Sequence, residues 1–269
     1  MKSERAPQRA SLNMPNILIV DSNPAAANAP FKETQGMTLG ENYAAALAAC
    51  RDDLTITIVA PYDGDDLPPL DGFDGVVFTG SSVEWNTDDA RAAPLADVMR
   101  KVFAQGLPTL GSCNGMQLAA SVLGGKSDAS PNGREDGLAK GVRLTEAGRD
   151  HPLLKGREDG FAVPCVHRDE VTDLPEGAVL LAGNDHSGVQ AFAYEQGGVK
   201  FWGMQYHPEI DPSNLGPSLG RMNWLSAQDA QDLEVVEQDP EAAQRLGVRI
   251  SDMNPNTRMT ELHNWLASL

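Results

Sequence analysis

The chain has 269 residues, and its 38 acidic residues outnumber its 21 lysines and arginines, which leaves a formal net charge of −17 at pH 7. So acidic a chain repels polyanions, and we exclude nucleic-acid binding. Hydrophobic residues make up 41% of the sequence and charged residues 22%, which is typical of a globular protein with a sizeable core. Apolar runs of membrane-spanning length and a signal-peptide core are both missing from the sequence, so we predict a cytoplasmic protein that does not bind membranes.

The first part of the chain alternates between short apolar runs and helix-forming segments. Residues 1–14 come before this pattern, are polar and charged, and are predicted to be a disordered tail. The predicted buried strands are 16–21, 54–60, 75–79 and 107–111, and the predicted helices are 41–51, 88–105 and 114–123. This alternation predicts an α/β fold with a Rossmann-like or flavodoxin-like central sheet, mostly parallel and flanked by helices.

The pattern changes after residue 125. Residues 126–140 are rich in Gly, Asp, Ser, Asn and Lys, which predicts a surface loop. Five short apolar segments with turn residues between them then predict an antiparallel extension of the sheet: 141–146, 161–166, 178–182, 189–194 and 199–205.

The last part of the chain, residues 212–269, has helical patterning. The acidic stretch 229–241 is predicted to be a solvated helix face. Apolar residues at helical spacing near the end are predicted to cover the domain's own sheet, with partner docking as the alternative: Met259, Leu262, Trp265 and Leu266. We therefore predict one domain over 15–211 and a helical extension over 212–269 packed on it.

Cys113 stands where a predicted buried strand turns into a helix. The segment GSCNG at 111–115 has the form of a nucleophile elbow with cysteine in place of serine. The helix that follows favours a thiolate, and the Asn114 N–H points toward a developing oxyanion. A small buried structural cysteine is the alternative. The other cysteines, Cys50 and Cys165, complete an odd set without metal-ligand spacing, so we predict neither a disulfide framework nor a metal site.

A thiol nucleophile needs a base, and the base needs an orienting acceptor. His207 and Glu209 stand just after the apolar run 199–206, two residues apart at the end of a predicted strand. Glu209 can therefore hold the imidazole while its other nitrogen faces Cys113. Alone, a His-x-Glu pair is weak evidence; its place after a strand, downstream of Cys113, makes it informative.

The two motifs GSCNGMQ at 111–117 and MQYHPE at 204–209 together resemble the class I (triad) glutamine amidotransferase domain, over about residues 16–211. The chain is similar to a stand-alone glutaminase of the GMP-synthetase type. The resemblance implies that family's fold, no cofactor, and an enzyme that forms a γ-glutamyl thioester and releases ammonia. It implies Cys113 as nucleophile, His207 as base and acid, and Glu209 as its orienting partner.

The resemblance also extends to the pocket. Gln117 matches a substrate-contacting glutamine, and residues 79–82 match the loop that supplies a second oxyanion N–H. Gly80 is therefore expected to bind substrate, and Ser81 to complete the oxyanion hole with Asn114. The family usually has Gly-Gly-Pro where this chain has Gly80, Ser81 and Ser82, which predicts a different wall around the leaving group.

Three functions remain open at this point. The chain is a glutaminase that delivers ammonia to a separate synthetase subunit, or a hydrolase of γ-glutamyl amides that needs no such partner, or a catalytically silent regulatory subunit. The intact triad makes the third the least favoured, and the altered loop at Ser81 and Ser82 suits the second. Of two side chains outside the triad, Trp85 lines the pocket mouth or anchors a loop, and His167 is structural or functional.

Overall fold

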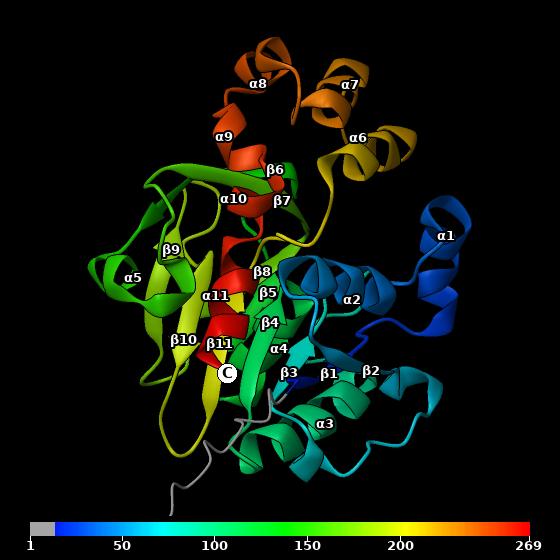
Figure 1. The fold of residues 1–269 in the computed structure, drawn as a ribbon, viewed down its shortest axis with the longest axis vertical. Coiled ribbons are helices and arrows are strands. Elements are labelled where there is room, and N and C mark those ends of the chain that lie inside the picture. The colour runs from blue at the N-terminus through cyan, green and yellow to red at the C-terminus, as the bar shows by residue number, and fades with distance from the viewer. Residues whose placement is uncertain (1–13) are drawn as a thin grey trace, which may run out of the picture.

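The computed structural model describes residues 14–269, so the predicted tail lies outside the described residues except for exposed Met14. One sheet of nine strands forms the centre, in the order β2-β1-β3-β4-β11-β10-β9-β6-β7, with helices packed on it (Figure 1). The predicted α/β fold is therefore confirmed. Within residues 14–269, none of the helices is long and apolar enough to cross a bilayer.

Five neighbouring strands are parallel: β1 (Asn16–Val20), β2 (Thr55–Val59), β3 (Gly75–Phe78), β4 (Pro108–Ser112) and β11 (Lys200–Met204). Most are nearly continuous apolar runs, as expected of strands covered on both faces. One face packs against α2 (Leu39–Cys50) and α11 (Thr260–Ser268), and the other against α3 (Ala93–Ala104) and α4 (Asn114–Val122). Helix α1 (Ala25–Gln35) follows β1.

The sheet continues with antiparallel strands: β6 (Glu135–Leu144), β7 (Phe161–His167), β9 (Val179–Gly183) and β10 (Ala191–Tyr194). The predicted surface loop over 126–140 is wrong. It contains β5 (Lys126–Ala129), which pairs with β8 (Asp169–Asp173), and the start of β6. Polar groups such as Glu135 are buried here and hydrogen-bonded within the protein, so the segment lacks the apolar alternation that marks a strand.

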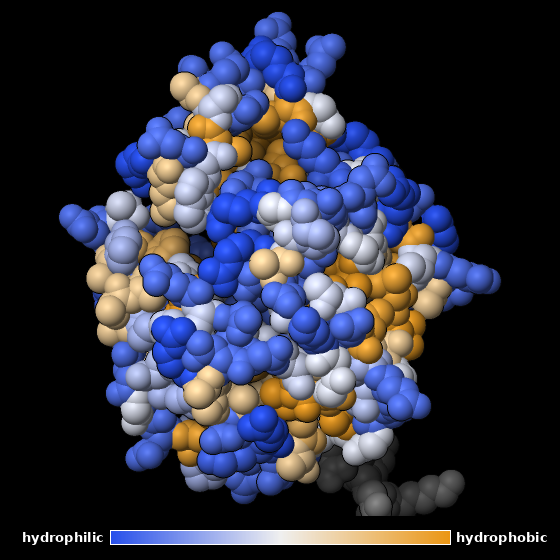
Figure 2. Space-filling model, turned by 180° about the vertical axis from the view of Figure 1, so that it is seen from behind, coloured by the Kyte–Doolittle hydropathy of each residue, from blue (hydrophilic) through white to orange (hydrophobic). Residues whose placement is uncertain are grey.

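Residues after 211 form six helices, with α5 (Glu146–Asp150) lying earlier in the chain: α6 (Pro212–Arg221), α7 (Ala227–Val235), α8 (Pro240–Leu246), α9 (Ile250–Met253), α10 (Pro255–Arg258) and α11. Helices α6 to α9 stand at the top of Figure 1 and have their own apolar cluster. Figure 2 shows a mostly hydrophilic face with an apolar hollow in this upper part. The prediction of a solvated face over 229–241 is wrong for Asp232, which is buried and paired with Arg245.

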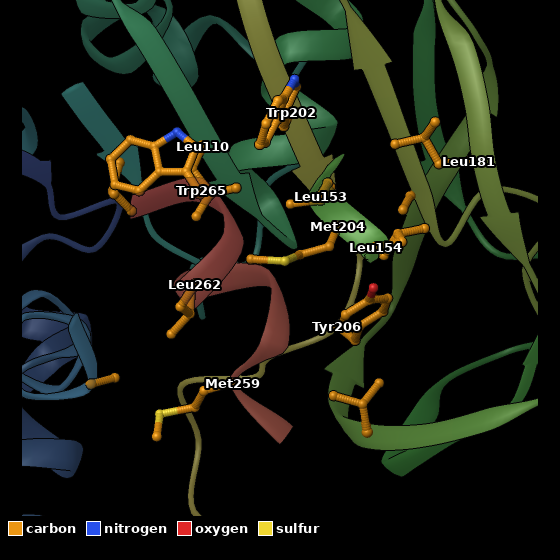
Figure 3. Close-up of a cluster of buried hydrophobic side chains, with 14 of the residues drawn as sticks. Leu110, Leu153, Leu154, Leu181, Trp202, Met204, Tyr206, Met259, Leu262 and Trp265 are labelled. Carbon is orange, nitrogen blue, oxygen red and sulfur yellow. The ribbon is translucent and has the colours of Figure 1, made fainter. Parts of the chain in front are cut away.

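Helix α11 packs on the sheet beside β4 and β11. Its side chains Leu262 and Trp265 are buried, and Figure 3 shows them among Leu110 and Met204 of the sheet. The apolar stripe predicted near the end of the chain therefore covers the domain's own sheet. The exact division into a domain over 15–211 and an extension over 212–269 stays a prediction.

A buried ion pair fixes α11 to the rest of the protein. Arg157 donates to both carboxylate oxygens of Glu261, at 2.8 and 2.6 Å, and both side chains are fully buried. The Tyr206 hydroxyl donates to the same carboxylate at 2.8 Å. Because Tyr206 directly precedes His207, this ion pair holds the chain next to the predicted base.

Candidate active site

Cys113 lies in a strained turn between β4 and α4. Its backbone has φ 48° and ψ −106°, a region that side-chain-bearing residues rarely adopt, and its N–H donates to the Met204 carbonyl at 2.8 Å. The flanking glycines are needed for close contact, since a Cβ at Gly111 would lie 2.7 Å from the Gly115 carbonyl carbon, and one at Gly115 would lie 2.4 Å from the Phe78 oxygen. The local sequence thus builds the predicted elbow.

The register of the sheet brings His207 to this elbow. Strands β4 and β11 are parallel neighbours, with Met204 opposite Ser112, so the residues after both strands meet at one edge. His207 Nδ1 lies 2.7 Å from Glu209 Oε1, and both side chains are buried. Within residues 14–269, His207 Nε2 is buried without a hydrogen-bond partner, and Cys113 is near enough to influence the pKa of the ring.

The electrostatics of His207 are set by this pair. Burial lowers its pKa, but the Glu209 carboxylate and the Cys113 side chain more than reverse that effect and raise the pKa to about 10. His207 therefore keeps a proton at neutral pH. It can give that proton to a leaving nitrogen, as a general acid.

The loop after β3 is tied to the loop after β1. The Ser81 hydroxyl lies within hydrogen-bond distance of two acceptors, the Ser22 carbonyl at 2.8 Å and Asn23 Oδ1 at 2.9 Å. The Ser82 N–H donates to the same Asn23 oxygen at 2.8 Å. Strands β2 and β3 lie on opposite sides of β1, so this loop pair sits where α/β sheets bind ligands. The Ser81 side chain is thus engaged by the protein, which fixes the loop beside the end of β1.

Gln117, on α4, is buried at the base of the site. Its Nε2 donates to the Asp169 carbonyl at 2.7 Å and to Gln205 Oε1 at 3.1 Å, so both N–H groups are used. Its carbonyl oxygen is the polar atom left for a substrate. Asn114 begins α4, and N–H groups in the first turn of a helix have no partner within that helix.

A cavity of about 390 Å³ opens beside Cys113. Ser81, Cys113, Asn114 and Gln117 line it together, as does Trp85, which the sequence placed either there or as a loop anchor. Sequence reasoning missed the side chains that complete its outer part: Phe31, Met37, Leu219, Met222 and Trp224. They come from α1, α6 and the adjacent turns, and only the folded chain brings them beside Cys113.

His167 belongs to a buried polar network next to the cavity. Its Nε2 lies 2.8 Å from Glu135 Oε2 and its Nδ1 lies 3.0 Å from the Asp169 carbonyl, so both ring nitrogens face acceptors. Glu135, Cys165 and His167 place three potential metal-ligand atoms within 4.8 Å of one another. Asn184 Nδ2 also donates to Glu135, at 2.6 Å. The polar atoms of His167 and Glu135 are thus engaged in hydrogen bonds within the protein. This favours a structural role for His167 over a functional one.

The sequence model of the family described as glutamine amidotransferase class-I matches residues 36–226. The chain belongs to this family. It is therefore a cysteine amidohydrolase of the glutamine amidotransferase type, as its two motifs indicated. The matched range extends beyond residue 211, where the sequence predicted the domain to end.

Two kinds of curated protein resemble this amidotransferase. A γ-glutamyl-L-1-hydroxyisopropylamide hydrolase from a Pseudomonas species is 33% identical over 94% of this chain and 92% of its own length. The GMP synthase of Clostridium novyi is 33% identical over 54% of this chain. That match spans only 26% of the GMP synthase, so the chain covers about a quarter of this relative's length.

Solved structures show the same fold. A glutamine amidotransferase from Thermotoga maritima has a TM-score of 0.66 and 18% identity, covering 95% of this chain and 97% of its own. A glutamine amidotransferase from Methylobacillus flagellatus has a TM-score of 0.67 and 18% identity, covering 95% of each chain. The structural likeness thus runs through almost the whole amidotransferase chain.

Gly80 sets the room available to the imidazole. A Cβ at Gly80 would lie 2.5 Å from His207 Cε1, so we expect Gly80→Ala to displace the ring and lower kcat/KM for amide hydrolysis about 100-fold. Initial rates of amine or ammonia release measure the effect, and a melting curve checks folding. Exposed Gly72 is the matched control, because a Cβ there meets nothing within 4 Å. Wild-type activity in Gly80→Ala would contradict the site geometry.

Proposed function

We propose that this chain hydrolyses γ-glutamyl amides through Cys113, His207 and Glu209, releasing an amine without a synthetase partner. The observation that carries the proposal is the position of the strained Cys113 beside a buried His207–Glu209 pair. Among residues 14–269, His207 Nε2 has no hydrogen-bond partner. A positioned nucleophile, a base and an orienting carboxylate are the parts of a hydrolytic triad.

The reaction follows from these positions. Cys113 attacks as the thiolate, with its proton already held on His207, and Sγ forms a bond to the amide carbonyl carbon. The C–N bond then breaks, His207 protonates the leaving nitrogen, and a γ-glutamyl thioester remains on Cys113. A water molecule attacks the thioester while His207 takes its proton. The C–S bond breaks and glutamate leaves, which restores the Cys113 thiolate and leaves the proton on His207.

The remaining predicted site residues act on the substrate. The backbone N–H groups of Ser81 and Asn114 bind the oxyanion that forms on each attack, since both residues line the cavity beside Cys113. Gln117 offers its carbonyl oxygen to the amino-acid end of the substrate. Gly80 leaves the space in which the reacting group and the imidazole meet.

The comparisons support hydrolysis of a substituted amide. The Pseudomonas relative, named for a γ-glutamyl amide that it hydrolyses, matches this chain nearly end to end. The GMP synthases match only through a fraction of their length. That partial match supports the second candidate, a glutaminase that passes ammonia to a separate synthetase subunit.

Turnover by the purified chain alone tests this proposal. Release of amine from γ-glutamyl isopropylamide is compared with release of ammonia from glutamine, under the same conditions. Faster hydrolysis of the substituted amide supports the stand-alone hydrolase. Glutamine turnover that becomes fast only after a synthetase is added would select the second candidate.

A further inference from the structure

We propose that the outer part of the catalytic cavity is a subsite for the leaving amine, and that it selects γ-glutamyl amides whose amine carries an uncharged, apolar group. The inference rests on the proposed amide hydrolysis and adds the substrate class. It concerns five side chains that we call the outer wall: Phe31, Met37, Leu219, Met222 and Trp224.

The size of the cavity exceeds what glutamine needs. Glutamine has about ten non-hydrogen atoms, whereas the cavity of about 390 Å³ lies in the range that holds larger small-molecule ligands. The γ-glutamyl part must reach Cys113 and Gln117, which line the inner end. The space along the outer wall is therefore left for whatever is bonded to the amide nitrogen.

The outer wall is apolar and partly open to solvent. Met37 is 42% exposed, and Met222 and Trp224 are each 44% exposed, yet all three line the same cavity as Cys113. An apolar ligand that covers large exposed apolar side chains removes their surface from water, and this makes binding more favourable. The wall thus favours an alkyl or aryl substituent on the leaving amine.

Charged groups near the wall argue against an ionic substituent. Arg168 is paired with Asp169 through two hydrogen bonds of 2.7 and 2.9 Å, and Arg134 is paired with Asp136 at 2.9 Å. Both guanidinium groups are thus neutralised by carboxylates, which weakens their attraction for an anionic tail. Arg134 also lies 3.7 Å from the centre of the Trp224 ring, so its charge opposes a cationic tail beside that ring.

The wall is held in position before a substrate binds. The Trp224 N–H donates to the Leu219 carbonyl at 3.0 Å, and Asn223 between them adopts a left-handed φ of 56°. The Arg134 guanidinium also stacks on the Trp224 ring. A preformed wall loses little side-chain freedom on binding, which makes Trp224 the strongest candidate for a specificity-determining residue.

A matched series of substrates tests the subsite. The purified chain is assayed with γ-glutamyl methylamide, γ-glutamyl n-butylamide and two analogues of the butylamide that end in a carboxylate or an ammonium group. Each covered methylene contributes about fourfold, so we expect kcat/KM for the butylamide to exceed that for the methylamide about 60-fold. Both charged analogues are expected to fall at least about tenfold below the butylamide.

Variants locate the effect. Trp224→Ala is expected to lower the butylamide-to-methylamide ratio about tenfold. Val179→Ala, an apolar side chain that is 43% exposed and lies outside the cavity, is expected to leave that ratio unchanged. Melting curves confirm that both variants fold.

The possible failures are distinguishable. If no γ-glutamyl amide is hydrolysed, the proposed function fails. If amides are hydrolysed but the methylamide and butylamide react equally well, or Trp224→Ala leaves their ratio unchanged, the hydrolase stands and the apolar subsite is overturned. Preference for a charged analogue would overturn the substrate class. Glutamine turnover stimulated by a synthetase, with Trp224→Ala abolishing that stimulation, would assign the wall to a protein partner.

Discussion

Replacing Cys113 with alanine is expected to lower kcat/KM for γ-glutamyl amide hydrolysis by at least about 10⁴-fold, because no other group can form the thioester. A glutamine-like diazo-ketone should modify Cys113 in the native protein with a stoichiometry of one. Mass spectrometry of the labelled peptide measures this directly. The alanine variant should take up no label and should melt like the native protein.

The other cysteines provide the control. Burial raises the pKa of Cys50 to about 11, despite an opposing effect of Arg258, and burial raises the pKa of Cys165 well above its usual value. Both thiols should therefore stay protonated and unreactive at neutral pH. We expect Cys50→Ala to keep full activity and full labelling. Labelling at Cys50 or Cys165, with activity intact in Cys113→Ala, would remove Cys113 from the mechanism.

Replacing Glu209 with glutamine is expected to lower kcat/KM about 10³-fold. The Glu209 carboxylate accepts from His207 Nδ1 at 2.7 Å, and an amide in its place neither fixes the ring tautomer as firmly nor stabilises the imidazolium. The same assay and a melting curve are used. Exposed Glu84, which lines the cavity away from the triad, gives the matched control Glu84→Gln. Equal losses in both variants would contradict an orienting role for Glu209.

The pH dependence of the Glu209 variant gives a second readout. In the native protein burial lowers the pKa of His207, and Glu209 together with Cys113 raises it to about 10, so protonated His207 is lost only as the pH rises through about 10. Glu209→Gln removes the Glu209 charge, which raises the pKa of His207 more than Cys113 does. The alkaline limb of kcat/KM should therefore move to lower pH in the variant. An alkaline limb at the same pH in both proteins would show that Glu209 does not set the protonation of His207.

Much of the site was predictable because it depends on local sequence. The apolar runs 16–21 and 75–79 mark buried strands, and the glycines around Cys113 mark a tight turn. Parallel strands place their carboxyl ends at one edge, so the residues after β4 and β11 meet there. The predicted nucleophile and the His207–Glu209 pair accordingly lie together in the structure, while their catalytic roles stay predictions until tested.

Other features depend on contacts that no local pattern records. Helix α1 contains Pro30 and lacks a clear apolar stripe, so it was not predicted. Glu135 begins a strand whose sequence is as polar as that of a loop. Its buried carboxylate is hydrogen-bonded by His167 and Asn184, which come from distant segments of the chain. In the sequence Trp224 is an isolated aromatic residue, and only the packing of α6 brings it to the wall of the cavity.

The buried contact of Arg157 and Tyr206 with Glu261 has a consequence for synthesis of the chain. His207, the predicted base, is held through Tyr206 by a carboxylate that the ribosome adds 54 residues later, counting from 207 to 261. At about 5–20 residues per second, translation of that interval takes several seconds. Throughout this time a nascent chain already contains Cys113 and His207 but lacks the anchor beside the base. The contact beside His207 can therefore form only after helix α11 has been synthesised.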